Sequence, residues 1–333
     1  MRMAASPGGK HGVADRRGVL RCAFSVALAP AQAQAQARGP RALPKLATFG
    51  GSGCDAMPGI ARFEGWLGRP VDLVLDFGEY RHDWDEMVRQ SEWLARCWRP
   101  TGRRVVLGLP LVVASASGPA ALRRGADGAF DRYFQAVARN LADGGLGDAI
   151  LRPGWEFNVA GYAWSALREP RAFAAFWRRT ALAMRAAAPG ARFVFDWNPN
   201  LGDGPVEEAY PGDDVVDVIG LDAYNQSWPF HRDPERRWRH LLDHRNGLRW
   251  HRDFAAARGK PRSFPEWGTG TRADGHGGGD DPLFIRNMLA WMREGPPVAY
   301  HGYWDHPSPE YDAQVTDGRR PLAAAALREG LRE

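Results

Sequence analysis

Ile150-Leu151-Arg152-Pro153-Gly154-Trp155-Glu156-Phe157-Asn158 joins a short apolar run to a glutamate that stands between two aromatic residues. The run predicts a buried strand, and strand alternation places Arg152, Gly154 and Glu156 on one face. A carboxylate at the end of a buried strand costs free energy unless the protein uses it. Ser263-Phe264-Pro265-Glu266-Trp267-Gly268 repeats the pattern later in the chain. The two stretches predict a pair of catalytic carboxylates and a fold that brings them together.

Strand-like and helix-like segments alternate along the chain. Apolar runs of strand length cover residues 45–50, 71–77, 104–111, 149–156, 191–197, 215–224, 261–267 and 298–304. Helical spacing of apolar residues predicts helices over residues 60–67, 84–98, 130–141, 170–187, 234–258, 283–293 and 320–331. Asp83 and Asp281 stand in the N-cap position of two helices, and Pro282 follows Asp281 at the first helical position. This alternation predicts parallel strands joined by helices.

Eight strands with helices between most of them match the (β/α)8 barrel, or TIM barrel. The chain has 333 residues, of which 44% are hydrophobic and 25% charged, and this suits one α/β domain of that size. A doubly wound open sheet is the alternative, but no Gly-x-Gly-x-x-Gly follows the first strand. An open sheet also leaves unexplained why polar and aromatic residues gather at so many strand ends. We therefore expect a single (β/α)8 domain over residues 45–333.

The first segment has the layout of an export signal. Residues 16–21 are rich in arginine and include an adjacent pair, residues 22–31 are largely apolar, and residues 31–37 alternate alanine and glutamine. This order is typical of a bacterial secretory signal peptide, and the arginine pair is compatible with twin-arginine export. We expect a signal peptide over residues 1–37, a linker over residues 38–44, and a periplasmic or extracellular protein. A disordered, alanine-rich N-terminus is the alternative.

The net charge of +5 comes mostly from this first segment. Residues 1–37 contain five basic residues and one aspartate, which leaves about +1 for the rest of the chain. The remainder therefore lacks the basic excess that nucleic-acid binding requires. No apolar run reaches the length of a membrane span. We expect a monomer without a nucleic-acid partner.

Cys54 and Cys97 remain once the segment that contains Cys22 is removed. An exported location permits a disulfide between them, but the sequence leaves the pairing open. The cysteine and histidine spacings predict neither a metal site nor a cofactor. His240 and His244 lie four residues apart on an expected helix, where we expect a solvated face outside the barrel and no bound metal.

Polar and aromatic residues collect where the expected strands end. In a (β/α)8 barrel these ends share one rim, and the active site lies there. The rim would receive Asp76, Glu79, Glu156, Asn158, Asp196, Trp197, Asp222, Tyr224, Glu266, Trp267, Trp304 and Asp305. Aromatic rings stack on the apolar faces of sugar rings, while carboxylates and amides bind hydroxyl groups. The rim therefore predicts a carbohydrate ligand.

A pair of carboxylates suits the cleavage of a glycosidic bond, which needs a proton for the leaving oxygen and negative charge at the anomeric carbon. The expected fourth and seventh strands lie three apart around an eight-strand ring, so Glu156 and Glu266 would face each other across the rim. A carboxylate separation of about 5–5.5 Å predicts a retaining double displacement. A separation above about 6.5 Å would favour an inverting glycosidase or a polysaccharide lyase.

Three stretches together resemble the retaining clan A glycoside hydrolases, and most of all the family 26, β-mannanase-like group. They are residues 152–158 with Trp164 downstream, Tyr210-Pro211-Gly212-Asp213-Asp214 leading into residues 217–224, and Phe264-Pro265-Glu266-Trp267-Gly268. The similarity follows the same order over most of the chain after about residue 45.

This resemblance implies a secreted glycoside hydrolase that cleaves β-glycosidic bonds of a polysaccharide or oligosaccharide with retention. Glu156 would be the general acid/base, Glu266 the nucleophile, and Tyr224 a hydrogen-bond partner of Glu266. We expect substrate-binding roles for Arg152, Trp155, Asn158, Trp164, Trp197, Asp222, Tyr224, Trp267 and Trp304. The family typically carries histidine where Trp155 stands, so the resemblance does not extend to the choice of polysaccharide.

A carbohydrate-binding barrel without catalysis is the alternative outside the enzymes. Glu156 would then be a structural carboxylate paired with Arg152, which leaves Glu266 in need of a separate explanation. For Asp222 and Tyr224, hydrogen bonding at the rim without catalysis is an equally good interpretation.

Overall fold

The computed structural model describes residues 42–118, 120–228 and 233–332. The expected signal peptide over residues 1–37 lies outside this part of the chain. Of the expected linker, only residues 42–44 are described, and they form no regular element. None of the helices in the described ranges combines the length and the apolar character that a bilayer requires.

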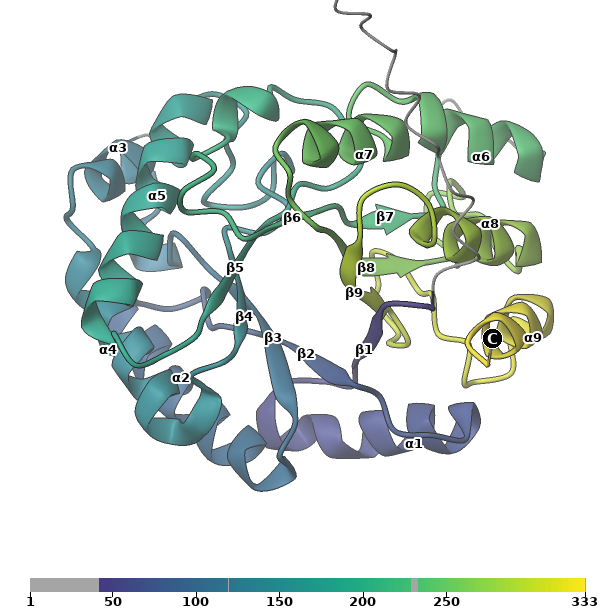
Figure 1. Ribbon diagram of the computed structural model, residues 1–333, viewed down its shortest axis with the longest axis horizontal. Coiled ribbons are helices and arrows are strands. Elements are labelled where there is room, and N and C mark those ends of the chain that lie inside the picture. The colour runs from purple at the N-terminus through teal and green to yellow at the C-terminus, as the bar shows by residue number, and fades with distance from the viewer. Residues whose placement is uncertain (1–41, 119, 229–232, 333) are drawn as a thin grey trace, which may run out of the picture. The chain divides into compact units, whose positions relative to one another are not determined.

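The strands form one closed parallel sheet (Figure 1). They are β1 (Lys45–Phe49), β2 (Leu73–Phe77), β3 (Arg104–Leu109), β4 (Ile150–Pro153), β5 (Val194–Trp197), β6 (Val218–Gly220), β7 (Ala223–Tyr224), β8 (Arg262–Gly268) and β9 (Val298–Tyr303). Their order is β6-β5-β4-β3-β2-β1-β9-β8-β7, and pairing of β6 with β8 closes the ring. The short strands β6 and β7 both pair with β8, so together they take one barrel position. The predicted (β/α)8 barrel is confirmed.

Helices surround this ring (Figure 1). They are α1 (Met57–Leu67), α2 (Trp84–Trp98), α3 (Ala121–Ala126), α4 (Asp131–Leu141), α5 (Pro170–Ala187), α6 (Pro234–Asp243), α7 (Leu248–Ala257), α8 (Pro282–Met292) and α9 (Pro321–Gly330). The predicted N-caps are confirmed: Asp83 accepts a hydrogen bond from the backbone N–H of Glu86, and Asp281 accepts from those of Leu283 and Phe284.

The long helical region expected over residues 234–258 is divided into two helices, because the chain breaks between α6 and α7. His244 leaves the helical conformation, and Gly247 becomes the N-cap of α7. A Cβ at Gly247 would lie 2.4 Å from the carbonyl oxygen of Leu241. Only glycine fits this close approach, and apolar periodicity carries no sign of it. The short helix α3 was not predicted.

The barrel interior has an apolar layer toward the N-terminal ends of the strands, here called the lower layer, and a polar layer toward their C-terminal ends. Leu73, Leu75, Val106 and Ile150 pack together in the lower layer with two further side chains, Ala47 and Tyr300. Strand alternation places Arg152 on the same face as Ile150, two residues nearer the C-terminal rim. Arg152 is completely buried there. A buried cation needs anionic partners, and Arg152 binds the carboxylates of Asp222 and Glu266. The polar layer therefore holds Glu266 at the C-terminal end of the barrel.

A disulfide joins Cys54 to Cys97, and their Cα atoms are 4.9 Å apart. It ties the short 3-10 helix η1 (Gly53–Ala56), which precedes α1, to the end of α2. Asp76 at the end of β2 holds the same segment, since its carboxylate accepts hydrogen bonds from the Ser52 hydroxyl and the Gly53 N–H. The pairing that the sequence left open is therefore present.

Replacing Cys54 and Cys97 together with serine is expected to lower the free energy of unfolding by about 2–4 kcal/mol. The two residues are 43 positions apart, so the bond restricts a long loop in the unfolded chain. Chemical denaturation of the oxidised protein and the double variant measures the difference. Equal midpoints and slopes would contradict a stabilising role, and the reduced wild-type protein should match the variant.

Candidate active site

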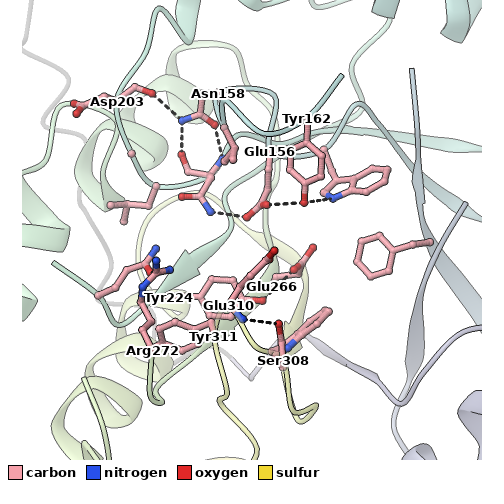
Figure 2. Close-up of a pocket in the computed structure, with 18 of the residues that line it drawn as sticks. Glu156, Asn158, Tyr162, Asp203, Tyr224, Glu266, Arg272, Ser308, Glu310 and Tyr311 are labelled. Atoms are coloured by element: carbon pink, nitrogen blue, oxygen red, sulfur yellow. Dashed lines mark hydrogen bonds between the residues drawn. The ribbon is translucent and has the colours of Figure 1, made fainter. Parts of the chain in front are cut away.

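A cleft of about 720 Å³ opens at the C-terminal ends of the strands. It is lined by Phe49 in β1, Phe77 in β2, Glu156 after β4, Tyr224 in β7, Glu266 in β8 and Trp304 after β9, among others. Figure 2 shows Glu156 on one side of this cleft and Glu266 with Tyr224 on another. The two glutamates that the sequence singled out therefore share one cavity.

Glu156 lies on a turn and not, as predicted, on the strand. Strand β4 ends at Pro153, and Gly154 adopts a φ of 60°. Glu156 itself has a φ of 50°, and among the described residues it is the one non-glycine with a positive value. Such a conformation costs free energy and is concentrated at functional sites. On this turn the Glu156 side chain lines the cleft.

Arg152 holds Glu266 and Asp222 together below the cleft. One terminal nitrogen, Nη2, donates to both Glu266 Oε1 and Asp222 Oδ2, at 2.7 Å each. Arg152 Nε donates to Asn198 Oδ1 at 3.0 Å. The side chains of Arg152 and Asp222 have no exposed area, and Glu266 is 6% exposed. A buried ion pair of this kind fixes the geometry of the carboxylate that it holds.

Asp222 links this ion pair to the backbone of Glu266. Asp222 Oδ1 accepts from the backbone N–H of Glu266 at 2.9 Å, and Oδ2 also accepts from Asn198 Nδ2 at 2.7 Å. Tyr224 donates its hydroxyl proton to Glu266 Oε2 at 3.0 Å. Each oxygen of Glu266 thus has a donor, as the resemblance implied for Tyr224.

Burial and neighbouring charge shift the pKa values in this group. Burial lowers the pKa of Arg152, but the charges of Asp222 and Glu266 outweigh burial and raise it overall. Burial raises the pKa of Asp222 well above its ordinary value, and the charge of Arg152 opposes this. Arg152 is therefore a permanent cation, and its charge favours the ionised forms of Asp222 and Glu156.

Glu156 has a different environment. Its Oε1 accepts from Asn200 Nδ2, and its Oε2 accepts from the Tyr162 hydroxyl at 3.2 Å. Burial, followed by the charge of Glu266, raises the pKa of Glu156 to about 7, while Asn200, Arg152 and Tyr162 act in the opposite direction. A carboxyl with this pKa can carry a proton near neutrality, and it can also accept one.

The expected substrate-binding residues divide into those that line the cleft, those that lie beneath it, and three tryptophans that pack elsewhere in the protein. Trp155, Asn158, Tyr224 and Trp304 line the cleft. Arg152 and Asp222 lie beneath it and contact Glu266. Asn158 uses its amide on the protein itself, since Nδ2 donates to the carbonyl oxygens of Asn200 and Asp203 and Oδ1 accepts from the Asn200 N–H.

For Trp164, Trp197 and Trp267 the expected substrate contact needs correction, because all three side chains are completely buried and none lines the cleft. Their indole N–H groups donate to the Trp155 carbonyl, the Ala209 carbonyl and His301 Nδ1, respectively. Position at a strand end does not reveal whether a ring faces the rim or the surrounding helices. These tryptophans pack within the protein.

Sequence reasoning missed several residues that line the cleft, among them Phe49, Phe77, Tyr80, Arg81, Tyr162, Asn200, Trp228, Arg272, Glu310 and Tyr311. Asn200 had a signal, since it closes the polar run Asp196-Trp197-Asn198-Pro199-Asn200 that follows an expected strand. Tyr162 had none, because it lies in a loop whose path depends on tertiary contacts.

His240 and His244 also line the cleft, so the expected solvated face outside the barrel is wrong. The break after α6 brings the end of that helix to the rim. His244 Nε2 lies 3.6 Å from Asp203 Oδ1. Within the described ranges, no cluster of three or more histidine, cysteine or acidic side chains could hold a metal ion.

A closed (β/α)8 barrel with paired glutamates at its C-terminal rim defines a class of barrel glycosidases. Residues 128–248 match the sequence model of glycosyl hydrolase family 26. This segment contains Arg152, Glu156, Asp222 and Tyr224, and it ends before Glu266. The match confirms the resemblance to family 26, and the chain is a glycoside hydrolase.

Solved structures share the fold. A modular endo-β-1,4-mannanase from Cellulomonas fimi aligns with a TM-score of 0.61 and 18% identity, over 85% of this chain and 70% of the mannanase. GH26C from Muricauda sp. aligns with a TM-score of 0.65 and 16% identity, over 88% and 86%. A GH26 β-mannanase from Bacteroides ovatus aligns with a TM-score of 0.59 and 15% identity, over 88% and 89%. Among curated proteins, none is significantly similar in sequence.

Proposed function

We propose that the protein hydrolyses β-glycosidic bonds of a polysaccharide or oligosaccharide with retention of configuration, with Glu156 as general acid/base and Glu266 as nucleophile. The observation that supports these roles is the contrast between the two carboxylates. Glu266 accepts from a permanent cation and a phenol, whereas Glu156 contacts two neutral donors and has a pKa raised to about 7. A carboxyl with a raised pKa opposite a carboxylate that is held by a cation suits a pair of acid and nucleophile.

The proposed reaction proceeds in two steps, formation of a glycosyl ester and its hydrolysis. In the first, the Glu266 carboxylate attacks the anomeric carbon while the proton of Glu156 passes to the leaving oxygen, which gives a glycosyl ester and a free sugar hydroxyl. In the second, the Glu156 carboxylate takes a proton from water, the water oxygen bonds to the anomeric carbon, and Glu266 leaves as a carboxylate. Arg152 and Tyr224 stabilise the negative charge of Glu266 before and after the covalent stage.

Aromatic residues near the carboxylates support a sugar ligand. Trp304 lines the cleft and stacks on Phe49, with ring centroids 4.6 Å apart and an angle of 10° between the planes. The two solved neighbours described as mannanases make mannan the first polysaccharide to assay. Trp155 stands in the wall beside Glu156, so glucans and bacterial exopolysaccharides belong in the same panel.

A screen of polysaccharides for released reducing ends tests the activity, and NMR of the first-formed product tests its stereochemistry. We expect the anomeric signal of the product to match the configuration of the bond that was cleaved. An inverted first product would overturn the double displacement. Product with an unsaturated sugar end would identify a lyase.

The dependence of kcat/KM on pH should show an alkaline limb near pH 7. Glu156 must be protonated for the first step, and burial raises its pKa to about 7. Activity is therefore present below this pKa and lost as the pH rises through it. Initial rates from pH 4 to pH 10 measure the limb, with protein stability checked at each pH. A profile that stays level to pH 9 would contradict the role of Glu156 as the acid.

We also propose that residues 1–37 direct export, that residues 38–44 link them to the catalytic barrel, and that the mature protein is a monomer. The arginine pair and the apolar stretch support the signal, and the disulfide suits an oxidising compartment. Expression of the full chain in a bacterium with an intact twin-arginine pathway, followed by mass spectrometry of the exported protein, tests this. Retention of residues 1–37 in the exported protein would overturn it, and light scattering tests the monomer.

A further inference from the structure

The contacts of Glu156 include a hydrogen-bonded chain from Trp155. The indole N–H of Trp155 donates to the Tyr162 oxygen at 3.3 Å, and the Tyr162 hydroxyl donates to Glu156 Oε2 at 3.2 Å. An indole N–H can only donate, so the phenol oxygen must accept from it. The single hydroxyl proton of Tyr162 is then directed to Glu156. Figure 2 shows Tyr162 beside Glu156 in the cleft.

Packing holds Tyr162 in this position. Its ring stacks on Trp164, with centroids 4.6 Å apart and 14° between the planes, and it meets the edge of Trp155 at 5.6 Å. Trp164 in turn donates to the carbonyl oxygen of Trp155 at 2.9 Å. The three rings therefore form one unit beside Glu156, and the phenol has little freedom to turn away.

Asn200 approaches Glu156 from the other side and is fixed as firmly. Its Nδ2 donates to Glu156 Oε1. The amide of Asn158 binds both backbone groups of Asn200, at 2.8 Å to its N–H and 2.9 Å to its carbonyl oxygen. The backbone of Asn200 also forms an isolated β-bridge with that of Asp222. Asp222 in turn accepts a hydrogen bond from the backbone N–H of Glu266. The segment after β5 thus connects the surroundings of the two glutamates.

We propose that Tyr162, oriented by Trp155, and Asn200 form a two-donor clamp that fixes the Glu156 side chain and favours its carboxylate form. This rests on the proposed role of Glu156 as acid/base. Both donors bind the ionised carboxylate better than the neutral acid, so they oppose the effect of burial. Tyr162, Trp155 and Asn200 are positioning residues that set the pH at which Glu156 changes from acid to base.

Other charged and titratable groups also face this site. They are Glu266, Arg152, Asp222, Tyr224 and, beyond Tyr162, Tyr80. None of these changes in a Tyr162→Phe or Asn200→Ala variant. A change in the pKa of Glu156 in these variants would therefore come from the lost donor.

The test measures the pKa of Glu156 directly, by NMR titration of protein with 13C-labelled glutamate carboxyls. The Glu156 signal is identified by its absence in Glu156→Gln. Loss of one donor in Tyr162→Phe or Asn200→Ala should raise the pKa of Glu156 by about one pH unit, and the alkaline limb of kcat/KM should move up equally. Trp155→Phe, which lacks the indole N–H, should cause a smaller rise in the same direction.

A double variant separates orientation of Tyr162 from packing. If Trp155 acts through the Tyr162 hydroxyl, Trp155→Phe adds no further rise to Tyr162→Phe. Tyr210→Phe is the matched control, because that hydroxyl donates to Asp213 outside the cleft and its loss should leave the titration unchanged. Circular dichroism verifies folding, and Asn200→Ala tests the clamp independently if Tyr162→Phe does not fold.

Three results would overturn the proposal. They are an unchanged Glu156 pKa in both single-donor variants, a lowered pKa in either, and a full additional rise from Trp155→Phe in the Tyr162→Phe background. The titration needs no substrate, so its outcome is independent of the proposed function. Full activity of Glu156→Gln would instead remove the acid/base role while leaving the clamp to be judged by the titration.

Discussion

Replacing Glu266 with glutamine is expected to lower kcat/KM by roughly a thousandfold or more, with little change in the fold. Glutamine keeps the shape of the side chain but cannot form the glycosyl ester. The amide also removes the negative charge that faces Arg152 at 2.7 Å. Arg152 keeps Asp222 as a partner, so the protein should still fold.

Glu156→Gln is expected to cause a comparable loss on natural glycans, because the leaving oxygen is then not protonated. A substrate with a good leaving group needs little acid assistance, so Glu156→Ala should retain much of its first step on such a substrate. Added azide should then react with the glycosyl ester and speed turnover, and the sugar azide should have the configuration of the substrate. In Glu266→Ala no glycosyl ester forms, so azide can only attack the anomeric carbon of the substrate directly, and the sugar azide should then have the inverted configuration.

Steady-state rates on the polysaccharide found in the screen measure these effects, and thermal unfolding of each variant verifies the fold. Gln226→Ala is a useful comparison, because Gln226 lines the same cleft but contacts neither glutamate among the described hydrogen bonds. Full activity in either glutamine variant would contradict the proposed catalytic roles of Glu156 and Glu266.

Arg152→Met is expected to reduce the free energy of unfolding by about 3–5 kcal/mol and to abolish most activity. Methionine fills a similar volume but leaves Asp222 and Glu266 buried without their cation. Asp222 is completely buried and Glu266 is only 6% exposed where it lines the cleft, so water can replace little of the lost hydrogen bonding at 2.7 Å. Activity should fall because Glu266 loses the donor that holds one of its oxygens.

The destabilisation in Arg152→Met should shrink as the pH falls. Burial already raises the pKa of Asp222, and loss of Arg152 should raise it further. A carboxyl whose folded pKa exceeds the unfolded value costs stability above the folded pKa and costs nothing below the unfolded one. Urea unfolding at pH 7 and at pH 5 compares the two conditions.

Arg178→Met is the matched control for Arg152→Met. Arg178 donates to both oxygens of Asp214, at 2.6 Å and 2.7 Å, but the two side chains are 41% and 63% exposed. Water replaces such a pair, so its loss should cost less than about 1 kcal/mol. Equal effects of the two substitutions would show that burial of Arg152 does not govern its contribution.

Several structural features were predicted from the local sequence and are present in the structure. Asp83 and Asp281 cap their helices, as the short polar side chain before each apolar stretch predicted. The eight barrel positions followed from apolar runs separated by amphipathic helices. Glu156 and Glu266 were recognisable because a carboxylate at the end of a buried strand is costly. These features depend on neighbours within a few residues along the chain.

Other features depend on residues that are distant in sequence. The positive φ of Glu156 is held by contacts such as that of its N–H with the Asn198 carbonyl at 3.0 Å. The strand expected to reach Glu156 therefore ends at Pro153. Trp197 and Trp304 both occur at strand ends, yet one is buried and the other lines the cleft. Tyr162 contacts Glu156 from a loop whose sequence has no pattern that predicts this contact.

The sequence by itself determined the class of fold and the two carboxylates, because apolar periodicity and the cost of a buried charge act locally. Only the tertiary structure decided what surrounds those carboxylates. Arg152, Asp222 and Glu266 come from three different strands or strand junctions, and they meet because the ring closes between β6 and β8. That closure gives Glu266 a cation, whereas the pairing of β4 with β5 and the loop after Glu156 supply Glu156 with two neutral donors. This difference separates the chemistry of the two glutamates.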